Sequence, residues 1–268
     1  MSNIHPSAKV HATAIVAEGA RIGEEVEIGP FCLVGPDVVI GARTRLRNHV
    51  TVEGRTEIGC DNVVYAGACV GCDPQDKKYA GEATRLVVGD RNVIRENCTL
   101  SIGTVQDEGV TRVGDDNLFM ANVHVAHDCR VGSNVIIANN VALAGHVTVE
   151  DYAIVGGQTG VHQFVRIGEH SMTGGASAVL RDVPPFVICN GNPAEPHGLN
   201  LVGLRRSGYG DETLRALRRA YGALYRENLT VKEALEKIEA LKAEFPGAAE
   251  ELRRFANFVE ASPRGIIR

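Results

Sequence analysis

The sequence lacks several features that would point to particular classes of protein. No apolar run approaches the roughly 18 residues that a membrane-spanning helix needs. The first ten residues lack the basic and apolar segments of a signal peptide. The net charge is −5, so no general basic surface supports nucleic-acid binding. We therefore expect a cytoplasmic protein with no transmembrane segment and no nucleic-acid partner.

Cysteine is also missing from the arrangements that would give it a structural role. The seven cysteines are scattered and odd in number, which argues against a disulfide framework. Cys69 and Cys72 have CxxC spacing, but no second pair completes a four-thiolate zinc site, so we interpret this spacing as coincidental. Cys32, Cys98 and Cys129 occupy small positions of the repeat described next, where a thiol packs as a small hydrophobic group.

The sequence does contain a period of six residues. Aliphatic or similar residues recur every six positions from Ile4 to Val70 and from Val113 to Val179, and a small or β-branched residue usually follows four positions later. Neither a helix nor an isolated strand has this period, whereas a parallel β-helix does. Three repeats make one triangular coil of 18 residues, so a residue and its eighteenth successor lie on neighbouring coils, about 4.8 Å apart. Thirty glycines and no tryptophan suit such narrow corners.

Two polar segments, near residues 72–87 and 103–112, interrupt the repeat and predict loops that leave the β-helix. A regular coil needs no insertion, so both loops are candidates for function. We expect the β-helix to span residues 1–190.

After Val183 the pattern becomes helical, which predicts a C-terminal α-helical domain over residues 191–268. Thr230 followed by Glu233 predicts a capping box at one helix start. The expected apolar stripes are Leu214, Leu217, Tyr221, Leu224 and Tyr225; Val231, Leu235, Ile238 and Leu241; and Leu252, Phe255, Ala256 and Val259. This domain would cover the open strand edges of the last coil.

A cluster of histidines predicts a catalytic corner, formed by His124, His127, His146 and His162. By the stacking rule, Gly145 lies one coil above His127, and Gln163 lies one coil above Gly145. A neutral His127 suits the role of general base, and Asp128 could orient its imidazole. Gly145 could offer a backbone N–H to an oxyanion.

Other interpretations of these histidines compete with this one. A single histidine on the outer surface of a solenoid is more often inert than catalytic. We therefore assign no catalytic role to His5, His11, His49 or His197. His170 is expected on the surface. Zinc is the main rival, because histidines from adjacent faces bind it in trimeric γ-class carbonic anhydrases, leaving one open position. An inert or ice-binding solenoid would need threonine ladders, which the sequence lacks.

Six motifs occur in a specific order along the whole chain: QDKKYAGEATR (75–85), HVAHDC (124–129), LAGHV (143–147), HQF (162–164), GNPAEPHGLNLVGLRR (191–206) and the terminal RGIIR. Together they resemble the UDP-N-acetylglucosamine acyltransferases that open lipid A biosynthesis. The resemblance implies a left-handed parallel β-helix (a hexapeptide-repeat solenoid), a homotrimer and active sites between subunits. Handedness does not follow from the spacing, and it departs from the usual right-handed crossover.

The resemblance also implies a reaction, in which an (R)-3-hydroxyacyl group moves from the phosphopantetheine of acyl carrier protein to the 3-hydroxyl of UDP-N-acetylglucosamine, with no metal or other cofactor. It implies that His127 is the general base, Asp128 its partner and Gly145 the oxyanion donor. The implied substrate-binding residues are Gln75, Asp76, Lys78, His124, His146, His162, Gln163, Asn200, Arg205 and Arg206. The resemblance also implies that Met172 and Gly175 determine the length of the acyl chain. Ser207 replaces a residue that is often basic, leaving any diphosphate contact to Arg205 and Arg206.

The N-acyltransferase of the same pathway is the nearest enzymatic alternative. That enzyme typically has a globular domain before its β-helix, whereas the repeats here begin at Ile4. A zinc trimer resembling γ-carbonic anhydrase is the second alternative, although it would not need a lysine-bearing loop or a long helical tail.

Overall fold

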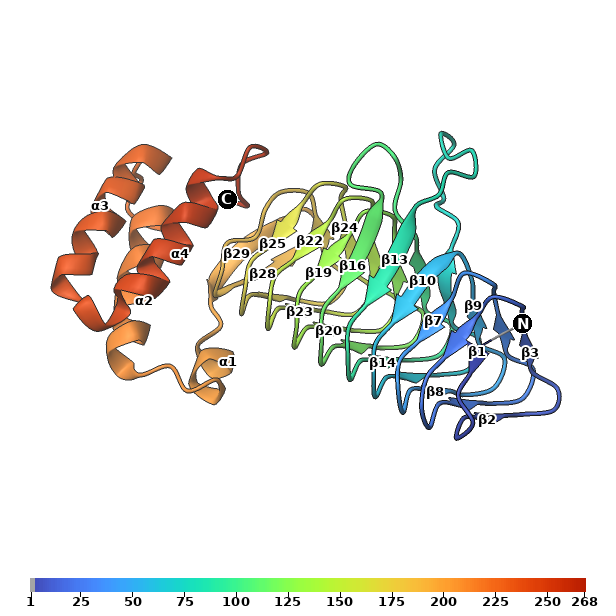
Figure 1. Cartoon of the computed structure of the whole chain (residues 1–268). Coiled ribbons are helices and arrows are strands. Elements are labelled where there is room, and N and C mark those ends of the chain that lie inside the picture. The colour runs from blue at the N-terminus through green and yellow to red at the C-terminus, as the bar shows by residue number, and fades with distance from the viewer. Residues whose placement is uncertain (1–2) are drawn as a thin grey trace.

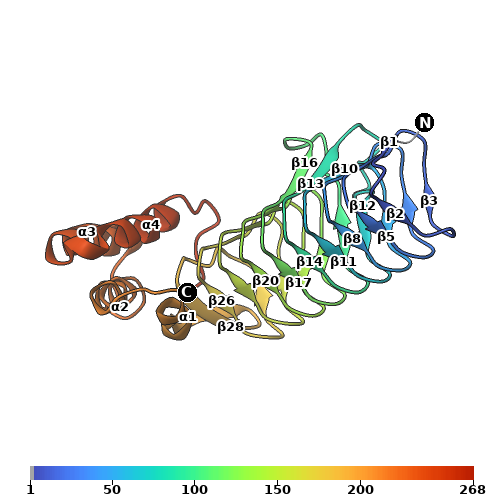
Figure 2. The same cartoon turned by 60° about the horizontal axis from the view of Figure 1, so that its bottom comes forward.

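A long three-sided β-helix leads into a small helical domain (Figures 1 and 2). The structure is a computed structural model and describes residues 3–268. Each coil contributes one short strand to each of three sheets, and all described strand pairs are parallel except the last hairpin. The predicted left-handed parallel β-helix with C-terminal helices is confirmed.

The strands fall into three sheets, one for each face of the prism. The first sheet contains β1 (Asn3–Ile4), β4 (Arg21–Ile22), β7 (Val39–Ile40), β10 (Arg55–Ile58), β13 (Arg85–Val88), β16 (Val110–Val113), β19 (Arg130–Val131), β22 (Thr148–Val149) and β25 (Arg166–Ile167). The second contains β2 (Lys9–Val10), β5 (Glu27–Ile28), β8 (Arg45–Leu46), β11 (Val63–Val64), β14 (Val93–Ile94), β17 (Leu118–Phe119), β20 (Ile136–Ile137), β23 (Ile154–Val155), β26 (Met172–Thr173), β28 (Val187–Gly191) and β29 (Ala194–Leu199). The third contains β3 (Ile15–Val16), β6 (Leu33–Val34), β9 (Thr51–Val52), β12 (Cys69–Cys72), β15 (Thr99–Ser101), β18 (His124–Val125), β21 (Ala142–Leu143), β24 (Gly160–Val161) and β27 (Ala178–Val179).

The pairing register shows the 18-residue coil directly. Arg45 pairs with Val63, and Leu118 pairs with Ile136, each at an offset of 18 residues. The offset rises to 30 between Val63 and Val93, and to 25 between Val93 and Leu118. Each increase marks a loop that leaves the coil and returns in phase. Inward and outward positions are therefore preserved along the whole prism.

Both loops are shorter than the breaks in the repeat suggest. The first occupies residues 73–84, between β12 and β13, and the second occupies residues 102–109, between β15 and β16. The other residues of the expected loops, Cys72, 85–87 and 110–112, belong to strands. The physical reason is that β13 and β16 pair along four residues, with Leu86 opposite Thr111 and both side chains buried.

The corners depend on residues with left-handed backbone. Positive φ recurs at six-residue intervals, for example at Asn122 (62°), Asp128 (60°), Asn134 (59°), Asn140 (60°) and His146 (63°). Asn, Asp and His adopt this conformation more readily than other residues with a Cβ. Asp128 and His146 therefore occupy equivalent corner positions on neighbouring coils.

The helical domain contains α1 (Leu201–Arg206), α2 (Asp211–Tyr225), α3 (Val231–Glu244), a 3₁₀ turn at Pro246–Ala248 and α4 (Ala249–Glu260). The predicted capping box of Thr230 and Glu233 is present at the start of α3. The expected boundary at residue 190 falls within the β28–β29 hairpin, and the first helix begins at Leu201. Val231, expected in an apolar stripe, is 36% exposed because it is the first residue of its helix. None of the helices in residues 3–268 is long and apolar enough to cross a membrane.

His170, expected on the surface, is only 7% exposed. Its ring stacks on Tyr152 with centroids 4.6 Å apart and meets the edge of Tyr209 at 5.2 Å. Its carbonyl accepts a hydrogen bond from Nδ2 of Asn200, which caps α1. Burial lowers the pKa of His170, and the nearby charge of Arg254 lowers it further. The helical domain thus covers a corner that the repeat alone would leave open.

This burial predicts a pH dependence of stability. The unfolded chain protonates His170 near its ordinary pKa of about 6.5, above the folded value, so stability is lost as the pH falls below about 6.5. We expect the free energy of unfolding, measured with urea between about pH 7.5 and 5.5, to fall more steeply for the wild type than for His170→Gln. His197→Gln, at an exposed position, should follow the wild type. Parallel curves for the wild type and His170→Gln would contradict this account.

Candidate active site

The histidine corner and the two loops enclose a cleft of about 840 Å³ within one chain. Its lining brings together Gln75, Asp76, Lys77, Lys78, Gln106, Asp107, His127, His146, Gln163 and Phe164. A second groove, of about 550 Å³, follows the third sheet and adds His124, Gly145, His162 and Leu180. Because His127 and Gln75 line both spaces, the cleft and the groove meet at the predicted catalytic corner.

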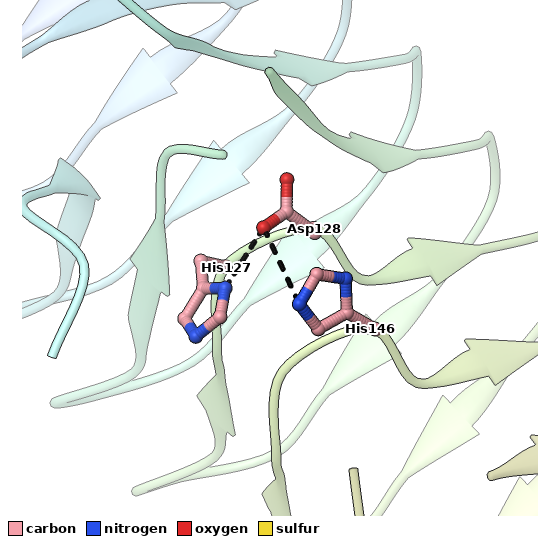
Figure 3. A group of neighbouring side chains, drawn as sticks. All are labelled: His127, Asp128 and His146. Carbon is pink, nitrogen blue, oxygen red and sulfur yellow. Dashed lines mark hydrogen bonds and ion pairs between the residues drawn. The ribbon is translucent and has the colours of Figure 1, made fainter. Parts of the chain in front are cut away.

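His127 and Asp128 form the centre of this corner (Figure 3). Nδ1 of His127 lies 2.8 Å from Oδ2 of Asp128, and the side chains are 15% and 0% exposed. A carboxylate partner at Nδ1 favours the tautomer that has its proton there. Nε2 of His127 is then left with a lone pair that can accept a proton. This is the arrangement that a general base requires.

Asp128 is held by the second loop. The backbone N–H of Thr104 donates to Oδ1 at 2.9 Å, and the hydroxyl of Thr104 donates to Oδ2 at 2.6 Å. The backbone N–H of Asp128 donates to the hydroxyl of Thr111 at 2.8 Å. Burial by itself would raise the pKa of Asp128, but the hydrogen bonds from His127 and Thr104 outweigh it and lower the pKa. Asp128 is therefore a fixed carboxylate that can stabilise a positive charge on His127.

His146 continues the network on the next coil. Its Nδ1 lies 3.1 Å from Oδ2 of Asp107, whose other oxygen accepts a hydrogen bond from Arg130 at 3.0 Å. The His146 ring meets the His127 ring edge-on at 5.1 Å and stacks on Phe164 at 4.3 Å. Asp107, at the ring nitrogen, and Phe164, on the ring face, together fix the orientation of His146.

His124 and His162 lie along the groove. Thr99 Oγ1 lies 2.7 Å from Nδ1 of His124, and burial, followed by the charge of His127, lowers the pKa of His124. His124 is thereby kept neutral next to the proposed base. His162 lies 3.3 Å from the guanidinium of Arg264. The C-terminal tail brings this arginine to the groove, because Ile266 pairs with Asp182 at the last coil.

Gly145 lies directly above the His127 ring. A Cβ on Gly145 would come within 2.6 Å of Cε1 and 2.7 Å of Nε2 of His127. Its own N–H finds no hydrogen-bond partner among residues 3–268. Because no group of the described chain accepts from it, this donor is available to an oxyanion of a bound substrate. Glycine is thus the one residue that leaves both the ring and the N–H accessible.

Five predicted residues lie away from the cleft within one chain. Met172 is on the second sheet in β26, and Gly175 is exposed at the corner that follows it. Asn200 is 6% exposed and caps α1 with its side chain. Arg205 and Arg206 are exposed in the last turn of that helix. A single chain therefore does not bring these residues to His127.

The same corner could in principle hold a metal ion. Three potential ligand atoms, one from each of His127, Asp128 and His146, lie within 4.8 Å of one another. However, Oδ2 of Asp128 already accepts from the Thr104 hydroxyl and from Nδ1 of His127. A zinc ion between these atoms would replace those hydrogen bonds. The geometry fits a hydrogen-bonded acid–base pair better than a metal centre.

Four residues of the corner were not assigned from the sequence: Thr104, Asp107, Phe164 and Arg264. Thr104 and Asp107 belong to the second ejected loop, which the repeat did mark as a functional candidate. Phe164 and Arg264 belong to the HQF and RGIIR motifs. The sequence could indicate that these segments are functional candidates. It could not give the contacts of their side chains, which depend on the path of the loop and of the C-terminal tail.

The position of Gly145 predicts the effect of a single methyl group. Gly145→Ala should displace the His127 ring, because the new Cβ would lie within 2.7 Å of its Nε2. We expect a large loss of kcat for any reaction that uses His127 as its base, with an unchanged circular dichroism spectrum. Gly222→Ala, in α2 and outside the cleft and the groove, is a matched control, because the nearest atom to a Cβ there is 3.8 Å away. Normal turnover by Gly145→Ala would refute the placement of the reacting atoms.

Comparison with known proteins identifies relatives over the full length of the chain. Residues 182–267 match the family model described as UDP-N-acetylglucosamine O-acyltransferase, domain 2, and residues 19–54 and 111–145 match the bacterial transferase hexapeptide model. The UDP-N-acetylglucosamine O-acyltransferase (LpxA) of Moraxella catarrhalis is 46% identical, with a TM-score of 0.86, over 99% of this chain and 100% of that one. LpxA of Acinetobacter baumannii is 44% identical over 100% of both chains, with a TM-score of 0.87. LpxA of Bacteroides fragilis, a UDP-N-acetylglucosamine acyltransferase, is 38% identical over 99% and 100%, with a TM-score of 0.89.

Proposed function

The chain belongs to the UDP-N-acetylglucosamine acyltransferase family, and on this basis we propose the reaction that it catalyses. An (R)-3-hydroxyacyl group passes from acyl carrier protein to the 3-hydroxyl of UDP-N-acetylglucosamine, the first step of lipid A biosynthesis, in the cytoplasm. The observation that supports this best is the His127–Asp128 hydrogen bond of 2.8 Å beneath the N–H of Gly145, which has no partner in the described part of the chain. No metal or other cofactor takes part in the proposal.

The residues of the corner suit each step of this transfer. Nε2 of His127 removes the proton of the sugar hydroxyl, whose oxygen attacks the thioester carbonyl. The N–H of Gly145 stabilises the oxyanion, and Asp128 stabilises the charged imidazole. When the intermediate collapses, the carbon–sulfur bond breaks and the carrier thiolate takes the proton from His127. The net products are the ester and the free thiol of the carrier.

Basic side chains that form no ion pair support the proposal that the substrates are anionic. Among residues 3–268, the side chains of Lys77, Lys78, Arg205 and Arg206 form no ion pair, whereas Arg43, Arg91, Arg130 and Arg166 of the β-helix each pair with a carboxylate. Nucleotide diphosphates and acyl carrier protein are both anionic. We propose that Gln75, Asp76 and Lys78 contact the sugar nucleotide from the loop side of the cleft. Arg205 and Arg206 contact the diphosphate or the carrier protein from the other side.

Assembly into a homotrimer would complete the site. Asn200, Arg205 and Arg206 lie at the end of the prism. Of the two residues proposed to limit the acyl chain, Met172 lies on the second sheet and Gly175 at the corner that follows it. We propose that in a closed cyclic trimer the second sheet and α1 of one subunit face the cleft of its neighbour. Ile15 and Leu33 on the third sheet are 64% and 40% exposed, as expected for residues that a neighbour covers.

The role of His127 can be tested with its alanine variant. We expect His127→Ala to lower kcat for acyl transfer to UDP-N-acetylglucosamine by roughly 10²–10⁴-fold, the usual contribution of a general base. His5→Ala, at an exposed position in the first coil and outside the lining of the cleft, serves as the control and should be fully active. Near-normal turnover of His127→Ala would overturn the mechanism. Stoichiometric zinc in the wild type, together with activity lost to chelators, would favour the zinc alternative instead.

A site shared between subunits predicts complementation. Trimers made only of His127→Ala or only of Arg206→Ala subunits should both be impaired. Mixed trimers, formed by co-expression with two different tags and purified on both, should recover activity, because some interfaces then join an intact His127 to an intact Arg206. Light scattering should give a trimer for every sample. A fully active monomer, or mixed trimers no more active than their parents, would contradict the shared site.

A further inference from the structure

The CxxC spacing of Cys69 and Cys72 places both thiols on one side of the third sheet. Cys69 pairs with Thr99 and Cys72 pairs with Ser101, while the register shifts between Val70 and Cys72. Gly71 is the extra residue of this bulge, and its φ of +87° is one that glycine adopts without strain. Because residues two apart on a partner strand share a face, the bulge turns two cysteines three apart toward the same side.

The two thiols have different surroundings. The sulfur of Cys72 interacts with the thiol of Cys69, and this contact affects the pKa of Cys72 more than any other. The same sulfur lies 3.6 Å from the Ser101 hydroxyl. The contact with Cys69, aided by Ser101 and opposed by burial, lowers the pKa of Cys72 to about 7. The same contact, together with burial and the carboxylate of Glu53, raises the pKa of Cys69. The Cys69 thiol can also donate to Oε1 of Glu53 at 3.5 Å. Cys72, next to a hydroxyl that can donate to a thiolate, is thus the better nucleophile of the pair, whereas Cys69 faces a carboxylate that can accept its proton.

The pair borders the active site. Cys72 ends β12 and is followed directly by the loop at residues 73–84, which places Gln75 and Lys78 in the cleft. On the same sheet, the column of outward residues runs from Cys69 through Thr99 to His124. Both cysteines are partly exposed and have free thiols. Any covalent change at Cys72 therefore acts at the attachment point of a substrate-binding loop.

We propose that Cys69 and Cys72 form a thiol–disulfide exchange site for low-molecular-weight disulfides, and that its closure shifts the loop at residues 73–84. The Cys72 thiolate attacks a disulfide RSSR, which forms a Cys72–SR mixed disulfide and releases one thiolate. Cys69 then loses its proton to Glu53 or water and attacks the Cys72 sulfur, which releases the second thiolate. The two cysteines are oxidised to one disulfide, and RSSR is reduced to two thiols. Reduced thiol in excess reverses both steps.

The exchange itself can be tested without any enzyme assay. The full-length protein would be equilibrated with mixtures of oxidised and reduced glutathione, quenched with acid, alkylated and mapped by mass spectrometry. We expect a reversible Cys69–Cys72 disulfide in the wild type and a stable glutathione adduct on Cys72 in Cys69→Ser. Cys60→Ser, which removes a partly exposed cysteine outside the pair, should behave as the wild type does. Two outcomes would overturn the site. Either Cys69 and Cys72 stay alkylatable at every glutathione ratio, or each carries its own glutathione in the wild type.

The effect on the loop depends on the proposed function and has its own measurement. We expect the oxidised wild type to show a severalfold higher KM for UDP-N-acetylglucosamine, restored by reduced thiol. The double variant Cys69→Ser, Cys72→Ser should show the same KM before and after oxidation. An unchanged KM in a protein shown to contain the disulfide would overturn the coupling to the loop. Absence of acyl transfer even in the reduced protein would instead count against the proposed function, while the mapping result would still decide the exchange site.

Discussion

The parallel hydrogen-bond ladder between successive coils is the constraint on which the rest of this structure depends. It fixes each residue above its counterpart 18 positions earlier, and the two inserted loops return to that register without a change of phase. The buried side chains of Val125, Leu143, Val161 and Val179 therefore stack in one column inside the prism. The same ladder holds Asp128 and His146 at equivalent corners. A slip of one residue would turn the core outward and separate the histidines at once.

On the coil that this ladder fixes, a buried carboxylate organises the histidine corner. Asp128 is fully buried, and an isolated charge in that position would be strongly destabilising. Three hydrogen bonds from Thr104 and His127 offset that cost and hold the carboxylate ionised. The second loop thus has two consequences. It satisfies Asp128, and through Asp107 it orients His146.

The proposed site combines residues on the rigid coil with residues on a loop, and the two groups have different proposed roles. The reacting groups proposed for His127 and Gly145 stand on the coil, where neighbouring strands fix them. The residues proposed to bind the sugar nucleotide stand on the loop at 73–84, which joins β12 to β13. The cysteine pair lies at one of these ends. A covalent change there would reach the residues proposed to bind substrate without disturbing the coil that carries His127 and Gly145.

The sequence by itself determined the parts of this protein that are periodic. Repeats of six residues predicted the coil, the stacking rule placed Gly145 above His127, and the helical spacing together with the Thr230–Glu233 capping box predicted the helical domain. Recognition of the motifs added the handedness and the acyltransferase family.

The tertiary structure decided what periodicity cannot encode. Thr104 reaches Asp128 across 24 positions and Asp107 reaches His146 across 39, through a loop whose path follows no repeat. His170 is buried because the distant residues Tyr209 and Asn200 fold over it, although its place in the repeat is an ordinary corner. Cys69 and Cys72 share a face because one glycine bulges out of register. In each case the contact depends on the direction of a non-repeating segment, which a rule of 18-residue stacking leaves open.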